Sequence, residues 1–170
     1  MATRKSMWIL FGILAISAWV LGSAIQAGAE TMKCKIATTT TKDESVTVSD
    51  EEGHSLHLLI TEGLAFFENG EIAKVRSHNL SDRISGKGSQ VIGYTIYTFE
   101  DGSTIVQRFQ RLMVSGDLSA KATGELIKGT GRFEGIKGTV SGTSRSFPGS
   151  KGEVTRNTSD MTFTYTLPAK

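Results

Sequence analysis

From Cys34 to Leu167 the sequence is a succession of short runs rich in threonine, valine, isoleucine and aromatic residues, separated by turn residues. Such runs favour β-strands, and we find no amphipathic helix of about ten residues or more among them. Asn69-Gly70 and Asp101-Gly102 each separate two runs, which predicts β-hairpins whose two central residues both have positive φ. The expected strands are Cys34–Thr41, Leu56–Phe67, Ile72–Leu80, Gln90–Glu100, Ser103–Val114, Ala120–Ile127, Lys137–Ser146 and Met161–Leu167.

Many short strands joined by turns indicate an all-β domain, either a sandwich or a closed barrel. One run in the middle of the chain is apolar on both faces. It carries Val91, Tyr97 and Phe99 on one face and Ile92, Tyr94 and Ile96 on the other. A small monomeric barrel normally has a polar outer face. The pattern therefore indicates either association with copies of the same chain or a strand covered by a loop or a terminus.

The N-terminal segment has the three parts of a secretory signal. A basic start is followed by the apolar run Met7–Leu21 and by the small-residue cleavage site Ala27-Gly28-Ala29. The alternative is an uncleaved membrane anchor, but the apolar run is shorter than the roughly 20 residues of a comfortable span. We expect residues 1–29 to be removed as a signal peptide. Residues 30–170 then form one exported β-barrel domain, secreted or periplasmic, without a membrane span.

Removal of the signal changes the charge balance. The whole chain has 19 basic and 17 acidic residues, and Arg4 and Lys5 lie in the signal, so the mature domain is formally neutral. A neutral domain gives no electrostatic reason to expect nucleic acid or an anionic membrane as a partner. Cys34 is the single cysteine, which excludes an intrachain disulfide. About 140 residues are enough to bury one ordinary core, and the fold must rest on that core.

The most distinctive stretch is Lys128–Gly142, KGTGRFEGIKGTVSG. Glycines spaced through a strand-turn-strand region mark positive φ or bends where a curved sheet turns a corner. No strand-to-helix transition surrounds the Gly-x-Gly, so a nucleotide site is not predicted. We therefore interpret the glycines as a structural motif, which consists of Gly129, Gly131, Gly135, Gly138 and Gly142.

The run Gly129–Gly138 resembles the glycine-rich signature of the allene oxide cyclase and dirigent superfamily, whose members carry a similar GG-T-G-x-F-x-G-x-x-G run late in the domain. The hairpin TFEDGSTIVQRFQ also resembles the strand pair that precedes this run in bacterial relatives, so the resemblance extends over Gln90–Ser146. It implies a small antiparallel eight-stranded barrel with a central apolar cavity, commonly found in oligomers. It does not imply the cyclase reaction, and it carries no active-site residue over to this chain.

Other candidate sites have little support from their spacing. His54-x-x-His57 resembles a metal-ligand pair, but on a strand a spacing of three places the rings on opposite faces, so no metal or cofactor is predicted. Arg108 and Arg111 likewise face opposite ways, which suits solvated outer positions better than an anion clamp. Cys34 is too isolated to be predicted as a nucleophile.

The sequence also predicts the environment of several other polar residues. Arg132 and Glu134 lie in the glycine-rich turn and are expected to form a surface pair. Glu62 lies between apolar runs and needs a partner if it is buried. Asn79-Leu80-Ser81 and Asn157-Thr158-Ser159 are glycosylation acceptors if the host is eukaryotic. No Ser/His/Asp or Cys/His arrangement follows from the spacing, so the catalytic residues stay unassigned.

The state of the barrel interior distinguishes three functions. The first is an exported module that binds a small apolar molecule, because small closed barrels leave room for side chains or for one ligand. The second is a cyclase-like or dirigent-like enzyme that guides a reactive apolar intermediate. The third is a structural oligomeric envelope protein with a packed interior. An empty apolar cavity favours the first, an inward carboxylate or tyrosine the second, and a filled interior the third. We also expect a homo-oligomer of closed symmetry, a dimer or a trimer.

Overall fold

The computed structural model describes residues 28–147 and 155–169. Residues 1–27 of the predicted signal peptide, including Ala27 of its cleavage site, lie outside these ranges, and within them no helix is long and apolar enough to cross a membrane. A single turn of 3-10 helix, η1 (Gly131–Phe133), lies between β6 and β7. The strands are β1 (Glu30–Thr47), β2 (His54–Phe67), β3 (Ile72–Ile84), β4 (Gly88–Phe99), β5 (Thr104–Val114), β6 (Ser119–Thr130), β7 (Lys137–Phe147) and β8 (Arg156–Thr166).

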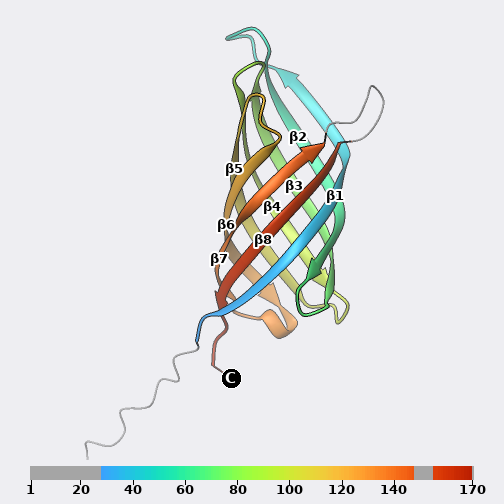
Figure 1. The fold of residues 1–170 in the computed structure, drawn as a ribbon, viewed down its shortest axis with the longest axis vertical. Coiled ribbons are helices and arrows are strands. Elements are labelled where there is room, and N and C mark those ends of the chain that lie inside the picture. Colours follow the sequence, from blue (N-terminus) through green and yellow to red (C-terminus); the bar gives the residue numbers. More distant parts are fainter. Residues whose placement is uncertain (1–27, 148–154, 170) are drawn as a thin grey trace, which may run out of the picture.

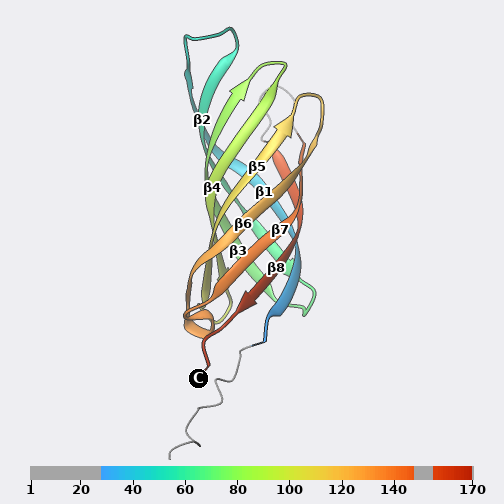
Figure 2. The same cartoon turned by 90° about the vertical axis from the view of Figure 1, so that its left-hand side faces the viewer.

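Each strand pairs antiparallel with its neighbours in sequence, and β1 pairs with β8 to close the sheet into a barrel (Figure 1). The predicted all-β, eight-stranded antiparallel barrel is therefore confirmed. Its terminal end is the end at which β1 begins and β8 finishes, and it also carries the β2–β3 and β4–β5 turns and η1 (Figures 1 and 2). Its distal end carries the β1–β2, β3–β4 and β5–β6 turns (Figure 2).

Both predicted hairpins are present, but the conformation of their turns differs from the prediction. Gly70 has a φ of +87° and Gly102 a φ of +78°, and no other residue type in the described part of the chain has a positive φ. The N–H of Gly70 donates to the carbonyl of Phe67 at 3.0 Å, and the N–H of Phe67 donates to the carbonyl of Glu71 at 2.9 Å. This pattern is a three-residue loop with one left-handed residue, in which only the second position of the Asn-Gly pair needs glycine.

Aromatic rings fill the terminal end of the barrel. The ring centroid of Phe67 lies 5.2 Å from that of Phe99 and 5.9 Å from that of Phe163. The ring of Phe99 also lies 4.9 Å from that of Phe133, which η1 brings over the opening. Aromatic pairs at such separations contribute about 0.5–1.5 kcal/mol each beyond the area they bury. These rings belong to one continuous buried core, which also includes Ile105, Leu126 and Val140.

The predicted surface pair of Arg132 with Glu134 is wrong. Arg132 Nη2 instead lies 2.5 Å from Glu71 Oε1, and its Nε lies 3.6 Å from Asp101 Oδ2. Its guanidinium also stacks on Phe99, 4.9 Å from the ring centroid. The reason is that η1 turns Arg132 back across the terminal end, whereas Glu134 stays exposed to solvent.

Strand β4 is apolar on both faces, as predicted. Val91, Tyr97 and Phe99 point into the barrel and are buried, with at most 4% of their surface exposed. Ile92 and Tyr94 point outward with 48% and 49% exposed. The inner row belongs to the core, whereas the outer row leaves large apolar side chains exposed to solvent.

The glycines of the glycine-rich run meet two different geometrical needs. Gly131 and Gly135 flank η1 with φ values of +61° and +75°, a left-handed conformation that side chains rarely adopt. At Gly129, Gly138 and Gly142 the backbone is not left-handed, but a Cβ would lie 2.0, 2.1 and 2.0 Å from a backbone oxygen of a facing segment. These three positions require glycine because two backbones approach each other closely.

We predict that Gly138→Ala lowers the free energy of unfolding by about 1–3 kcal/mol, because the strand must move away to admit the new Cβ. The carbonyl of Thr164 lies 2.1 Å from that Cβ position. Thr139→Ala is the matched control, since Thr139 is exposed on the outer face of the same strand, and it should change stability by about 0.5 kcal/mol or less. Denaturant unfolding measures both values. Equal stability of the two variants would contradict the close approach of β7 and β8.

Candidate functional site

The interior of the barrel changes character along its axis. The terminal half is filled by the aromatic cluster, whereas the distal half contains a cavity of about 80 Å³. The polar part of its lining consists of Thr38, Thr61, Ser77, Asn79, Thr95, Gln107, Arg111, Ser144, Asn157 and Ser159. The apolar part consists of Ile36, Val75, Phe109, Ala122 and Met161, and Tyr97 lies among them. The cavity is therefore neither filled nor wholly apolar, which departs from the apolar cavity implied by the resemblance.

Two glycines in the middle of strands make room for this lining. A Cβ at Gly93 would lie 2.6 Å from Asn79 Oδ1 and 3.0 Å from a ring carbon of Phe109. A Cβ at Gly124 would lie 2.7 Å from Gln107 Nε2 and 3.1 Å from Phe109 Cβ. Sequence reasoning missed both positions. The available signal was an isolated glycine inside a strand, which marks a close approach of neighbouring groups.

Hydrogen bonds fix several of the inward polar side chains. The hydroxyl of Tyr97 donates to Gln107 Oε1 at 2.8 Å, and the hydroxyls of Ser77 and Thr95 are 2.8 Å apart. Burial raises the pKa of Tyr97 well above its usual value, followed by a smaller effect of Cys34. The phenol is thus neutral and already engaged, so it serves as a fixed part of the wall rather than as a general base.

Arg111 extends from β5 into the interior, where sequence reasoning expected a solvated outer position. That expectation is right for Arg108, which is exposed and whose Nη2 lies 2.6 Å from Glu125 Oε2, and wrong for Arg111. Residues three apart on a strand point to opposite faces, so only one of the two can be outside. Arg111 Nη1 donates to Ser144 Oγ at 2.9 Å. Burial, and then the positive charge of Arg83, lower the pKa of Arg111.

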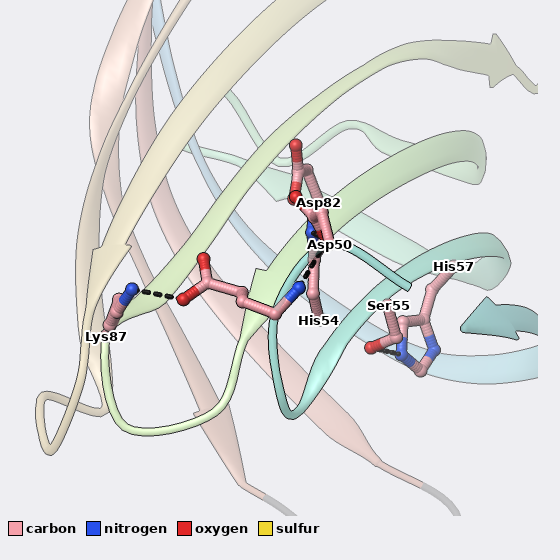
Figure 3. Close-up of polar contacts among 7 residues, drawn as sticks. Asp50, His54, Ser55, His57, Asp82 and Lys87 are labelled. Atoms are coloured by element: carbon pink, nitrogen blue, oxygen red, sulfur yellow. Dashed lines mark hydrogen bonds and ion pairs between the residues drawn. The ribbon is translucent and has the colours of Figure 1, made fainter. Parts of the chain in front are cut away.

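The two histidines of His54-x-x-His57 lie on opposite faces of β2, as predicted, and form separate clusters at the distal end (Figure 3). His54 Nδ1 lies 2.6 Å from Asp50 Oδ1, and its Nε2 lies 2.9 Å from Asp82 Oδ1. The hydrogen bond to Asp50 is the largest cause that raises the pKa of His54. Among the residues that the structure describes, no three histidine, cysteine or acidic side chains are placed to hold a metal ion.

The second cluster joins a hydroxyl, an imidazole and a carboxylate. His57 Nε2 lies 3.0 Å from Ser55 Oγ, and His57 Nδ1 lies 2.8 Å from Asp43 Oδ1. This connectivity matches that of a nucleophile, a general base and an orienting acid. Sequence spacing did not predict it because Asp43 belongs to β1. The register shifts between Thr40 and Lys42, and this bulge turns Asp43 to the inner face opposite Leu59.

The remaining sequence candidates have structural roles or are inaccessible. Cys34 is buried, and burial, assisted by Asp160, raises its pKa to about 12, so the thiol stays protonated. Glu62 is exposed, and its Oε1 lies 3.4 Å from Arg76 Nε. Asn79 and Asn157 point into the barrel with 4% and 9% of their surface exposed. The interpretation of these two asparagines as glycosylation acceptors therefore fails for the folded barrel, because the modification needs an accessible side chain.

Comparison with known proteins gives a likeness in fold alone. No protein-family model and no curated protein matches the sequence. The structure of the pterocarpan synthase dirigent protein GePTS1 is similar at 11% identity and a TM-score of 0.49, over 84% of this chain and 88% of that chain. The structure of the pterocarpan synthase dirigent protein PsPTS1 is similar at 12% identity and a TM-score of 0.47, over 82% and 97%. At these values neither neighbour assigns a residue role or an activity to this chain.

Proposed function

We propose that this chain is an exported barrel that binds one small molecule in the distal half of its interior. The observation that carries the proposal is the cavity of about 80 Å³, whose wall includes shielded polar atoms without a hydrogen-bond partner among the described residues. A filled interior would instead support a purely structural protein. An inward tyrosine would support an enzyme that guides a reactive intermediate, but the hydroxyl of Tyr97 already donates to Gln107 and its pKa is raised by burial, so it does not favour that function here. An apolar cavity of about 150 Å³ holds benzene, so this one fits a smaller molecule or one end of a longer one.

We predict that the protein purified from its own host retains a small-molecule adduct, visible in its native mass spectrum. Ala122 lines the cavity and Thr123 is exposed on the outer face of the same strand. Ala122→Leu should remove the adduct because the new side chain fills the space, while Thr123→Leu should retain it. Circular dichroism checks that both variants are folded. An adduct that survives in folded Ala122→Leu, or a wild-type protein with none, would overturn the proposal.

A second candidate function is hydrolysis of a small ester, and it rests on the cluster of Ser55, His57 and Asp43. In this reaction Ser55 Oγ would attack the ester carbonyl while its proton passes to His57 Nε2. His57 would return that proton to the leaving alcohol as the C–O bond breaks, and water would then release the acid and restore the serine. Asp43 would hold the imidazole in the orientation that this transfer needs.

We predict for this candidate that a fluorophosphonate probe labels one serine of the wild-type protein. Ser55→Ala should abolish labelling, and His57→Gln should slow it about 100-fold or more, the loss expected without a general base. Ser141→Ala is the control, because Ser141 is exposed on the outer face of β7. Intact mass and peptide mapping measure the labelling. An unlabelled wild type, or label that persists in Ser55→Ala, would remove esterase activity from consideration.

The outer face of β2, β3 and β4 supports a further proposal, that the barrel associates with copies of itself. Leu58, Leu80 and Ile92 lie in one register row and are 48%, 43% and 48% exposed. Tyr94 extends this outer apolar row along β4 and is 49% exposed. Contiguous apolar surface of this kind is uncommon on soluble monomers unless a partner covers it. A second copy of the chain is the partner we propose, in a dimer or trimer of closed symmetry.

We predict that Ile92→Lys yields a folded monomer, because a charge in the outer apolar row must be desolvated when copies associate. Thr158→Lys is the control, since Thr158 is exposed on β8, which contributes no residue to the row. Sedimentation velocity at micromolar concentration reports the oligomeric state of both variants. A monomeric wild type, or an Ile92→Lys variant that keeps the wild-type oligomer, would show that this row is not the interface.

A further inference from the structure

Three shielded polar atoms of the distal half have no hydrogen-bond partner within the described part of the chain. They are Arg111 Nε, Ser81 Oγ and Asn79 Oδ1. Ser81 on β3 and Arg111 on β5 lie in one register row, joined through Val91 on β4. Asn79 lies in the next inward row, where β4 contributes Gly93 and thus no side chain. Buried polar atoms are normally paired, because an unpaired one costs about 1–3 kcal/mol. Asn79 and Arg111 line the cavity, whereas Ser81 lies beside them outside its lining, so unpaired polar groups gather at this side of the cavity.

Of the three groups, Arg111 costs the most free energy to leave unpaired, because it carries a full charge. Its hydrogen bond goes to the neutral hydroxyl of Ser144, and it forms no ion pair with any carboxylate in the described ranges. Arg83, close enough to lower its pKa, adds a second positive charge to the same end of the barrel. A buried charge without an opposite charge is costly, and burial of this kind persists where function requires it. An anion would supply the missing charge.

We propose that the ligand of the cavity is a short carboxylic acid, an inference that rests on the binding function proposed above. Its carboxylate would accept hydrogen bonds from the guanidinium of Arg111, which lines the cavity and presents N–H donors in the planar geometry that a carboxylate matches. Asn79 Oδ1 is an acceptor, so it selects a ligand that also carries a hydroxyl or an N–H group. Val75 and Met161 line the same cavity and would contact the carbon chain.

The volume of the cavity limits the size of the ligand that it can hold. About 80 Å³ is little more than half of the roughly 150 Å³ that holds a benzene ring. A fatty acid or a polycyclic acid would not fit inside as a whole, whereas an aliphatic hydroxy acid or amino acid of a few carbons would. A phosphate dianion is less suited, because it has three strong acceptor oxygens and the wall offers fewer free donors.

A matched pair of variants tests the role of Arg111. Arg111→Met removes the inward charge and retains an unbranched side chain, and Arg108→Met removes the outward charge on the same strand. Without ligand, Arg111→Met should melt at the wild-type temperature or above it, because an unpaired buried charge is replaced by an apolar group. A variant that melts well below the wild type would show that Arg111 has a structural role, and the proposal would be wrong.

The binding experiment uses the mature protein and three probes: 3-hydroxybutyrate, its neutral amide 3-hydroxybutyramide, and inorganic phosphate. NMR titration follows the backbone amides of Ser81, Gly93 and Arg111. We expect 3-hydroxybutyrate to shift these signals and to bind wild type and Arg108→Met equally. Arg111→Met should bind it about thirtyfold more weakly or worse, the loss expected when one partner of a buried charge pair is removed. The amide should bind the wild type with a similar loss.

The outcomes separate this inference from the binding function. Equal binding of the acid and the amide, or undiminished binding by Arg111→Met, would overturn the carboxylate and leave the cavity as a neutral binding site. Phosphate that binds as tightly as 3-hydroxybutyrate would also overturn the choice of a carboxylate. If no probe shifts the signals while Ala122→Leu still loses the native adduct, the class of ligand proposed here is wrong and the binding function stands. If that adduct is also absent, both proposals fail.

Discussion

The pairing of β1 with β8 is the interaction on which the rest of this molecule depends. It extends from Glu30 opposite Tyr165 to Thr39 opposite Arg156, and it closes an open meander into a barrel. Closure divides every strand into an inner and an outer row of side chains. The inner rows must then share one narrow interior. Because the chain has one cysteine and hence no intrachain disulfide, this sheet and its core hold the fold together.

The two ends of the barrel interior have different roles. At the terminal end, Phe67, Phe99, Phe133 and Phe163 pack together, and Arg132 covers the opening. This apolar packing provides stability that the distal half does not need to supply. The distal half can therefore hold a group as costly as Arg111, whose Nε has no partner within the described residues. Such local departures from good packing are typical of functional sites.

Small irregularities of the backbone place the polar groups of the distal half. The bulge after Thr40 reverses the alternation of β1 and brings Asp43 to the inner face, where it meets His57. Gly93 and Gly124 remove side chains from β4 and β6, so that Phe109 and Gln107 have room between them. A perfectly regular barrel would place none of these groups together, because strict alternation and full-sized side chains would close the cavity.

The sequence by itself determined the fold class and most strand positions, because these depend on local patterns. Alternating apolar residues and Asx-Gly turns locate strands, and the two apolar faces around Tyr94 were readable for the same reason. The resemblance of the glycine-rich run then narrowed a sandwich or barrel to a barrel. Tertiary structure alone decided which of Arg108 and Arg111 lies inside, that Asp43 meets His57 and Ser55, and that Arg132 pairs with Glu71 rather than Glu134. The pairing of Arg132 depends on the turn that η1 makes at the terminal end. The other two outcomes depend on the register between strands and on the bulge that reverses the faces of β1. Neither leaves a periodic trace in the residues themselves, because a shift of one residue exchanges the inner and outer faces without altering the local pattern.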